Sequence, residues 1–390
     1  MFQRDWLRLD ALGVLTIVAY GTWFYGFGVL FGDLIEVHQV SAATLGVTYG
    51  AANLLAGIGA VATGRRLDVI GPRAVLGVIG PTGAFIYAAS IGFTGVPFLV
   101  CYATGGGLIG AAGFYAFTQP LAVRVADAEP TRAITRLTIW GAMSSPIMIP
   151  LTEALRSSYG WRAAIQVPAF ITAGAFLLSA SLCANPGSMT SSPPSFTTAL
   201  RSALRDFRIR RLAFAAFFSS IAASTLLVYQ VPAMTWAGVS ATTAAGLASA
   251  RGLMQLAGRL PLVRAIERFG APILVVVARL FMAGAAITIL VSANVVAAVV
   301  YVVLAGVSIG ALSALDGVVA RSIIPIDRLG TVMGGIGLVA TIGGSIGPIA
   351  GGGLRDLSGT PIATMVFATS SALVSVSIFW SMRITQNGSA

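Results

Sequence analysis

Residues 295–320 read VVAAVVYVVLAGVSIGALSALDGVVA, an apolar stretch that contains a single charged residue, Asp316. As an α-helix, such a stretch is long enough to cross the roughly 30 Å of hydrocarbon in a bilayer. The chain has eleven further apolar runs of this kind, over residues 11–32, 42–63, 74–93, 97–123, 134–155, 163–184, 212–231, 242–263, 273–292, 329–354 and 362–382. The sequence therefore predicts an all-α membrane protein with twelve transmembrane helices.

The overall composition agrees with this class and excludes several others. Of 390 residues, 56% are hydrophobic and 9% are charged, a balance that a water-facing globular surface does not have. Every basic residue is Arg, so lysine Schiff-base chemistry is excluded. Cys101, Cys183 and the single His38 form neither a disulfide framework nor a metal-ligand spacing, and the glycine runs lack a Gly-Lys-Ser/Thr phosphate motif. We expect no metal, no cofactor and no enzyme activity.

A Pro/Ser-rich and then basic segment divides the chain into two halves. We expect an N-terminal six-helix bundle over 1–184, a cytoplasmic basic linker over 185–211, and a C-terminal six-helix bundle over 212–390. The halves also repeat, because five pairs of residues are separated by the same 199 positions: Arg65 and Arg264, Asp68 and Glu267, Gly71 and Gly270, Arg156 and Arg355, and Gly160 and Gly359. A parallel repeat of this kind is typical of two bundles related by a pseudo-twofold axis.

The arginines indicate the orientation of the chain. Eighteen lie in the termini and loops on the side that holds both chain ends, against three on the opposite side. Since cytoplasmic loops carry an excess of basic residues, we expect both termini in the cytoplasm and the protein in the inner membrane. The same distribution accounts for most of the net charge of +11 without a nucleic-acid partner.

One loop carries an ordered motif, Gly64-Arg-Arg-Leu-Asp68-Val-Ile-Gly71-Pro-Arg73, between the second and third runs. It resembles the signature loop of the major facilitator superfamily, with a weaker copy ending in Glu267, Arg268 and Gly270. The resemblance covers the whole chain and implies that Gly64, Asp68, Gly71, Arg73 and Arg124, with Glu267 and Arg268, latch the two halves on the cytoplasmic side. Asp68 could accept hydrogen bonds from helix amides or from Arg124. The alternative is that these charges only anchor a loop at the headgroups.

Within that superfamily, three further segments look like the monocarboxylate and oxalate/formate transporter branch. They are Gly21-Thr-Trp-Phe-Tyr-Gly-Phe-Gly-Val29, Tyr159-Gly-Trp-Arg162, and Gly343-Gly-Ser-Ile-Gly-Pro348 followed by Asp356. The resemblance implies a carboxylate substrate and an arginine in the eighth helix that recognises it. Counted from the following loop, the matching position is Arg259.

Charged residues inside the predicted spans each need a physical reason, because they are costly in hydrocarbon. Arg259, Arg279 and Asp316 lie near the cytoplasmic ends of their runs, where they can form one paired cluster with a structural or gating role. Arg251 lies about 18 Å from the cytoplasmic end of its run, near the midplane, with no acidic residue at that depth. It is a candidate anion-binding residue, or else it bonds backbone carbonyls or reaches the headgroups.

Aromatic and amide side chains are expected to line the rest of the pathway. Gln255 lies one helical turn from Arg251 on the same side, and the other candidates are Tyr25, Tyr115, Gln119, Tyr229 and Gln230. For each aromatic residue, ordinary core or lipid-facing packing is the alternative.

These observations predict a secondary active or facilitative transporter of a small organic anion, working by alternating access and as a monomer. The anion is preferred because the last six spans hold three arginines and one aspartate. Coupling to a proton through Asp316 or to a counter-anion stays open. The alternatives are a multidrug exporter or an importer of an aromatic nutrient such as a vitamin, and a non-transporting membrane receptor.

Overall fold

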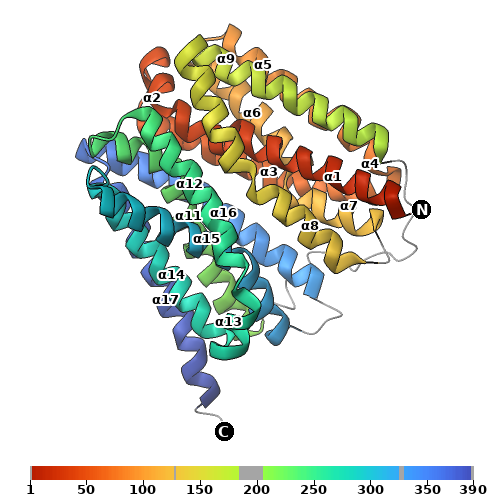
Figure 1. The fold of residues 1–390 in the computed structure, drawn as a ribbon, viewed down its shortest axis with the longest axis vertical. Helices are drawn as coiled ribbons and strands as arrows, with labels where there is room; N and C mark the ends of the chain where they lie inside the picture. The colour runs from red at the N-terminus through yellow and green to blue at the C-terminus, as the bar shows by residue number, and fades with distance from the viewer. Residues whose placement is uncertain (1, 127–128, 184–204, 325–328, 388–390) are drawn as a thin grey trace. The chain divides into compact units, whose positions relative to one another are not determined.

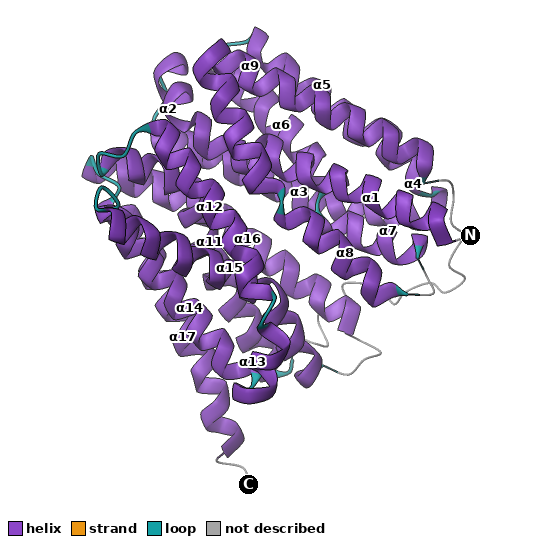
Figure 2. Cartoon of the chain, in the orientation of Figure 1, coloured by secondary structure: helices purple, strands orange, loops and turns teal. Residues whose placement is uncertain are grey.

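The secondary structure is helical throughout the part of the chain that the structure describes. A computed structural model describes residues 2–126, 129–183, 205–324 and 329–387, which form helices and the loops between them (Figure 2). The predicted linker lies largely outside these ranges. The all-α prediction is confirmed for the described residues.

The helices form two compact units, each treated separately below. The N-unit comprises residues 1–190 and 241–252, and the C-unit comprises residues 191–240 and 253–390. The boundary between them falls inside one helix, α12 (Ala241–Arg259). The proposed bounds 1–184 and 212–390 stay a prediction.

In the N-unit, α3 packs along α6, α5 packs along α6 and α9, and α1 packs along α8 and α9 (Figure 1). Its elements are α1 (Phe2–Ala19), the π-helix η1 (Tyr20–Tyr25), α2 (Gly26–His38), α3 (Ala42–Ile70), α4 (Pro72–Ala74), the π-helix η2 (Val75–Ile79), α5 (Gly80–Ala89), the 3₁₀ helix η3 (Ser90–Gly92), α6 (Gly95–Gly113), α7 (Tyr115–Val125), α8 (Pro130–Ala142) and α9 (Ser144–Leu182).

In the C-unit, α11 packs along α16 and α17, and α14 packs along α15 and α17. Its elements, beyond the second part of α12, are α11 (Phe207–Trp236), α13 (Leu262–Phe269), α14 (Ala271–Thr288), the 3₁₀ helix η4 (Ile289–Val291), α15 (Val295–Ile323), α16 (Leu329–Ser358) and α17 (Ile362–Asn387).

The number of spans approximately matches the twelve that the sequence predicts. Among the described residues, ten helical segments are long and apolar enough to cross a membrane. One of them, Arg132–Leu182, covers two of the predicted runs. Helix α12 is not among the ten, and its 19 residues include Arg251, Gln255 and Arg259.

One predicted run has different boundaries in the structure. The run over 242–263 was expected to be one helix, but α12 ends at Arg259 and a separate short helix, α13, follows. Pro261 lies between them, and proline cannot continue a helix because it lacks the amide hydrogen and its ring clashes with the preceding turn. Arg259 therefore closes α12 instead of lying inside it.

The internal repeat predicted from the sequence is visible in the backbone. Gly71 and Gly270 have φ of 82° and 80°, and Gly160 and Gly359 have φ of 84° and 67°. Each pair is separated by 199 positions. Gly71 and Gly270 each end one helix and begin the next, and Gly160 breaks the regular geometry inside α9. The two halves thus turn the chain at equivalent positions with the same residue type.

We expect Gly160→Ala to lower the free energy of unfolding by about 1–3 kcal/mol, because φ 84° and ψ 171° is a conformation that essentially only glycine adopts. Gly174→Ala is the matched control in the same helix, since a Cβ there meets nothing within 4 Å. It should be neutral or stabilise by up to about 1 kcal/mol. Thermal unfolding of the purified protein in detergent measures both, and equal melting temperatures for the two variants would contradict the assigned turn.

Candidate functional site

Arg251, in the part of α12 that belongs to the N-unit, is buried, and the described residues offer it no hydrogen-bond partner. Its side chain is 0% exposed, and within the described residues Nε, Nη1 and Nη2 all lack a partner. Its Cζ lies 5.7 Å from the centre of the Tyr25 ring, which is a cation–π distance. A buried guanidinium with five unused N–H donors is costly. The guanidinium can therefore donate hydrogen bonds to water or to a ligand that accepts them.

The first part of α12 is held against α9 by a close approach of the two helices. Ser249 Oγ donates to the carbonyl oxygen of Pro146 at 3.1 Å. A Cβ at Gly252 would overlap Ser145 Oγ and lie 2.8 Å from Pro146 Cδ. The Ser145 hydroxyl is itself buried with no hydrogen-bond partner in the described chain. A second unused polar group thus lies against the residue next to Arg251.

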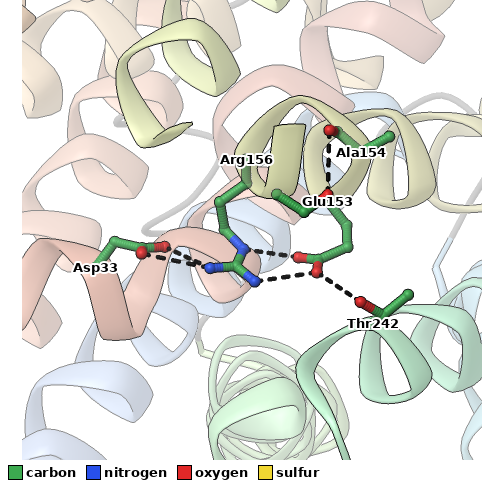
Figure 3. Close-up of polar contacts among 6 residues, drawn as sticks. Asp33, Glu153, Ala154, Arg156 and Thr242 are labelled. Carbon is green, nitrogen blue, oxygen red and sulfur yellow. Dashed lines mark hydrogen bonds and ion pairs between the residues drawn. The ribbon is translucent and has the colours of Figure 1, made fainter. Parts of the chain in front are cut away.

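A polar network fixes the start of α12 to the same unit (Figure 3). Arg156 donates to both oxygens of Glu153, Nε to Oε2 at 2.8 Å and Nη2 to Oε1 at 3.0 Å, and Nη1 contacts Asp33 at 3.4 Å. The Thr242 hydroxyl donates to Glu153 Oε1 at 3.1 Å. The sequence alone does not predict this network. The equivalent positions of Arg156 and Arg355 in the repeat are the feature of the sequence that could have pointed to it.

The other candidates in the N-unit lie on η1 and α7. Tyr25 ends the π-helix η1 and is half-buried. Tyr115 begins α7, and its hydroxyl donates to the carbonyl oxygen of Thr138 at 3.4 Å. Gln119 is half-buried on the same helix.

The two candidates on α11 take part in helix packing within the C-unit. The Tyr229 hydroxyl donates to the carbonyl oxygen of Pro348 at 2.8 Å. Gln230 accepts from the Tyr301 hydroxyl at 2.8 Å and donates to the carbonyl oxygen of Leu227 at 2.9 Å. These bonds connect α11 to α16 and α15 and satisfy groups that would otherwise be costly in an apolar bundle.

An ion pair lies beside a hollow in the C-unit. Arg279 Nη2 contacts Asp316 Oδ1 at 3.1 Å, with the arginine side chain 0% exposed and the aspartate 32% exposed. Asp316 lines a cavity of about 340 Å³ together with Ser219, Ser220, Ser313 and apolar side chains. Arg259, placed by the sequence in the same cluster, instead donates from Nε to the carbonyl oxygen of Gly310 at 3.4 Å. Gln255 packs against Gly310, and its Nε2 is buried with no partner in the described residues.

The signature loop is only partly described. Gly64 lies inside α3, and Gly71 makes the turn into α4. Arg124 Nη1 donates to the carbonyl oxygen of Leu67 at 3.1 Å. The side chain of Asp68 lies outside the described residues, so its expected bond with Arg124 stays a prediction. The remaining latch candidates, Arg73, Glu267 and Arg268, are exposed.

Comparison with solved structures places the fold. A mutant form of the nucleoside transporter NupG aligns with 96% of this chain and 99% of its own, at a TM-score of 0.80 and 13% identity. A D-xylose-proton symporter covers 96% and 97% at a TM-score of 0.73 and 14% identity. A bacterial homologue of the human lysosomal transporter Spinster covers 96% and 95% at a TM-score of 0.70 and 16% identity.

The chain has the major facilitator transporter fold. All three of these structures are transporters rather than enzymes. Identities this low show the fold alone. The sequence matches no protein-family profile and no curated protein.

We expect Gly252→Val to destabilise the protein by about 1–3 kcal/mol, because the added carbons must displace Ser145 or Pro146 and so move α12 away from α9. Gly246→Val is the matched control on the same helix, where an added Cβ meets nothing within 4 Å. Both variants carry the same change in helix propensity, so the difference in melting temperature isolates the contact. If the Gly252 variant is as stable as the Gly246 variant, the close approach of α12 to α9 does not help to position Arg251.

Asp316→Asn leaves Arg279 buried without its counter-charge. We expect a loss of about 2–3 kcal/mol, below the cost for a fully buried pair because the aspartate is partly exposed. The double variant Arg279→Met with Asp316→Asn should recover most of the lost stability. Glu129→Gln, which breaks the exposed pair with Arg132, should change stability by less than about 0.5 kcal/mol. If chemical or thermal unfolding shows the same small loss for Asp316→Asn, the pair does not stabilise the C-unit.

Proposed function

We propose that the protein is a secondary transporter that moves a small organic anion across the membrane by alternating access, with Arg251 as the residue that binds the anionic group. The observation that supports this most directly is the buried guanidinium of Arg251, which has no hydrogen-bond partner in the described residues. A carboxylate matches the planar fork of a guanidinium in shape and charge and can accept two hydrogen bonds from it. A neutral ligand would leave the charge uncompensated.

The surroundings of Arg251 support an anion rather than a cation. The ion pair of Arg279 and Asp316 neutralises itself within the C-unit. Glu153, the buried acidic residue of the N-unit, is already paired with Arg156. Arg251 is therefore a buried positive charge for which the described residues provide no counter-ion.

Arg259 is the second candidate, because the resemblance to the monocarboxylate and oxalate/formate branch points to its position. Its place at the last residue of α12 and its bond to the carbonyl oxygen of Gly310 favour a role in holding the helix end. We therefore assign substrate contact to Arg251 first, with Gln255 one turn away on the same helix. Membership of that branch stays a prediction.

Several further expectations belong to the same proposal. The arginine distribution supports cytoplasmic termini and an inner-membrane location. The signature loop, with Arg124 bound to the end of α3, is proposed to act in gating. Coupling to a proton through Asp316, exchange with a counter-anion, and facilitated flux all remain compatible with the site.

Uptake of a labelled carboxylate panel into vesicles reconstituted with the purified protein tests the proposal. We expect at least one carboxylate to be taken up, with Arg251→Gln lowering apparent affinity by about 10- to 100-fold, since a charged hydrogen bond contributes about 1.5–3 kcal/mol. Arg251→Lys should restore only part of it, because an ammonium cannot form the bidentate pair. Arg259→Gln is the comparison variant, expected to lose less.

Three outcomes would contradict parts of this assignment. Full transport by both arginine variants would show that neither arginine of α12 binds the anion. Uptake of neutral aromatic compounds that is insensitive to salt and to Arg251→Gln would favour an importer of an aromatic nutrient. Specific binding of a carboxylate without transport under any imposed gradient would favour a receptor.

A further inference from the structure

The ring in contact with Arg251 is the first of a continuous series. Tyr25 packs against Phe24 with ring centres 5.1 Å apart, and Phe24 packs against Tyr20 at 5.7 Å. Tyr20 stacks on Phe114 at 3.8 Å with the planes 3° apart, and it also contacts Tyr115 at 5.3 Å. We call these five residues the aromatic face: Tyr20, Phe24, Tyr25, Phe114 and Tyr115.

The aromatic face is accessible while the rings behind it are not. All five side chains are half-buried. Trp23 and Tyr49, which pack against them, are 0% and 1% exposed. Arg251 lies over Tyr25, so this face of the N-unit is the one that α12 covers. The series of half-buried rings therefore includes the ring that Arg251 contacts.

Irregular helix geometry presents these rings. Tyr20, Phe24 and Tyr25 belong to the π-helix η1, which lies close against α9 at Gly21, because a Cβ there would overlap Met148. Phe114 occupies the break between α6 and α7, with extended dihedral angles of −84° and 167°. Single π-turns occur often at functional sites, and interrupted membrane helices are where transporters place their substrates. Two such interruptions meet at the stacked pair of Tyr20 and Phe114.

We propose that the Arg251 site selects planar aromatic carboxylates, with the carboxylate on the guanidinium and the ring of the ligand against the aromatic face. This inference rests on the proposed function and specifies its substrate class. Ring faces alone would also attract a cation, but Arg251 already places a positive charge there and repels one. A saturated carboxylate gains burial at this surface but not the ring-to-ring contact.

Equilibrium binding distinguishes these contributions, and it avoids the passive permeation of weak acids that complicates vesicle assays. The probes are benzoate, cyclohexanecarboxylate, which has a similar size but a saturated ring, and benzamide, which keeps the ring without the charge. Ligand-dependent thermal stabilisation of the detergent-purified full chain reports each dissociation constant. We expect benzoate to bind about 2- to 10-fold more tightly than cyclohexanecarboxylate, the size of an aromatic contact. Benzamide should bind at least about 10-fold more weakly than benzoate.

Variants separate the ring contribution from the charge contribution. Phe24→Leu should reduce the preference for benzoate to less than about 2-fold while cyclohexanecarboxylate binding changes little. Tyr20→Leu serves as a second variant if Phe24→Leu does not fold. Arg251→Gln should weaken both carboxylates. Phe170→Leu, at an exposed ring on α9 outside the aromatic face, is the matched control and should keep the benzoate preference.

The outcomes separate this inference from the proposed function. Equal affinity for benzoate and cyclohexanecarboxylate, both lost in Arg251→Gln, would overturn the aromatic preference and leave the anion site standing. A benzoate preference that persists in both ring variants would also overturn it. Absence of Arg251-dependent binding for these two acids and for the wider carboxylate panel would overturn the proposed function itself.

Discussion

A polar group buried in an apolar bundle has no water to bond with, and this constraint governs the buried polar contacts described for this protein. Most of these polar groups bond with a side chain nearby in the same unit. Arg136 and Trp140 both donate to Asp10, at 2.7 and 3.0 Å, and Arg156 forms a bidentate pair with Glu153. Among the described residues, Arg251 has the most buried polar atoms without a partner, since Nε, Nη1 and Nη2 all lack one; single atoms such as Ser145 Oγ and Gln255 Nε2 also lack one. A group that the fold positions but does not satisfy indicates a place where something else is meant to bind.

The satisfied contacts around Arg251 explain why its side chain cannot simply turn away. Thr242 ties the start of α12 to Glu153, Ser249 bonds the backbone at Pro146, and Gly252 allows the helix to lie directly against Ser145. These three contacts are spread over the part of α12 that belongs to the N-unit. Together they fix both the position and the rotation of the helix. The unused donors are thereby held over Tyr25 at a cost that the neighbouring contacts offset.

The sequence predicts those features that depend on local properties. Hydropathy alone predicts the helices, and the spacing of Gly71, Gly160, Gly270 and Gly359 predicts a repeat whose turns share one backbone conformation. Features set by distant neighbours were not predictable. The close packing of the π-helix η1 against α9 at Gly21 involves Met148, which is distant in sequence, and His38 is buried with its ring stacked on Phe98 at 3.8 Å. The isolation of Arg251 was predictable because no acidic residue shares its depth, whereas its aromatic neighbours depend on which face of α12 meets the N-unit.

Charge and aromatic surface have opposite requirements in such a site, and their combination narrows what can bind. A guanidinium attracts a charged anion. A strongly hydrated anion, however, would have to lose its bound water to lie against the faces of aromatic rings, and that loss is costly. An apolar ligand suits the rings but leaves the guanidinium unpaired. A ligand that concentrates its charge at one end and presents a flat apolar body at the other meets both requirements at once. Because Arg251 contacts the edge of the aromatic face at Tyr25 and not its middle at Tyr20, the geometry itself separates the two ends.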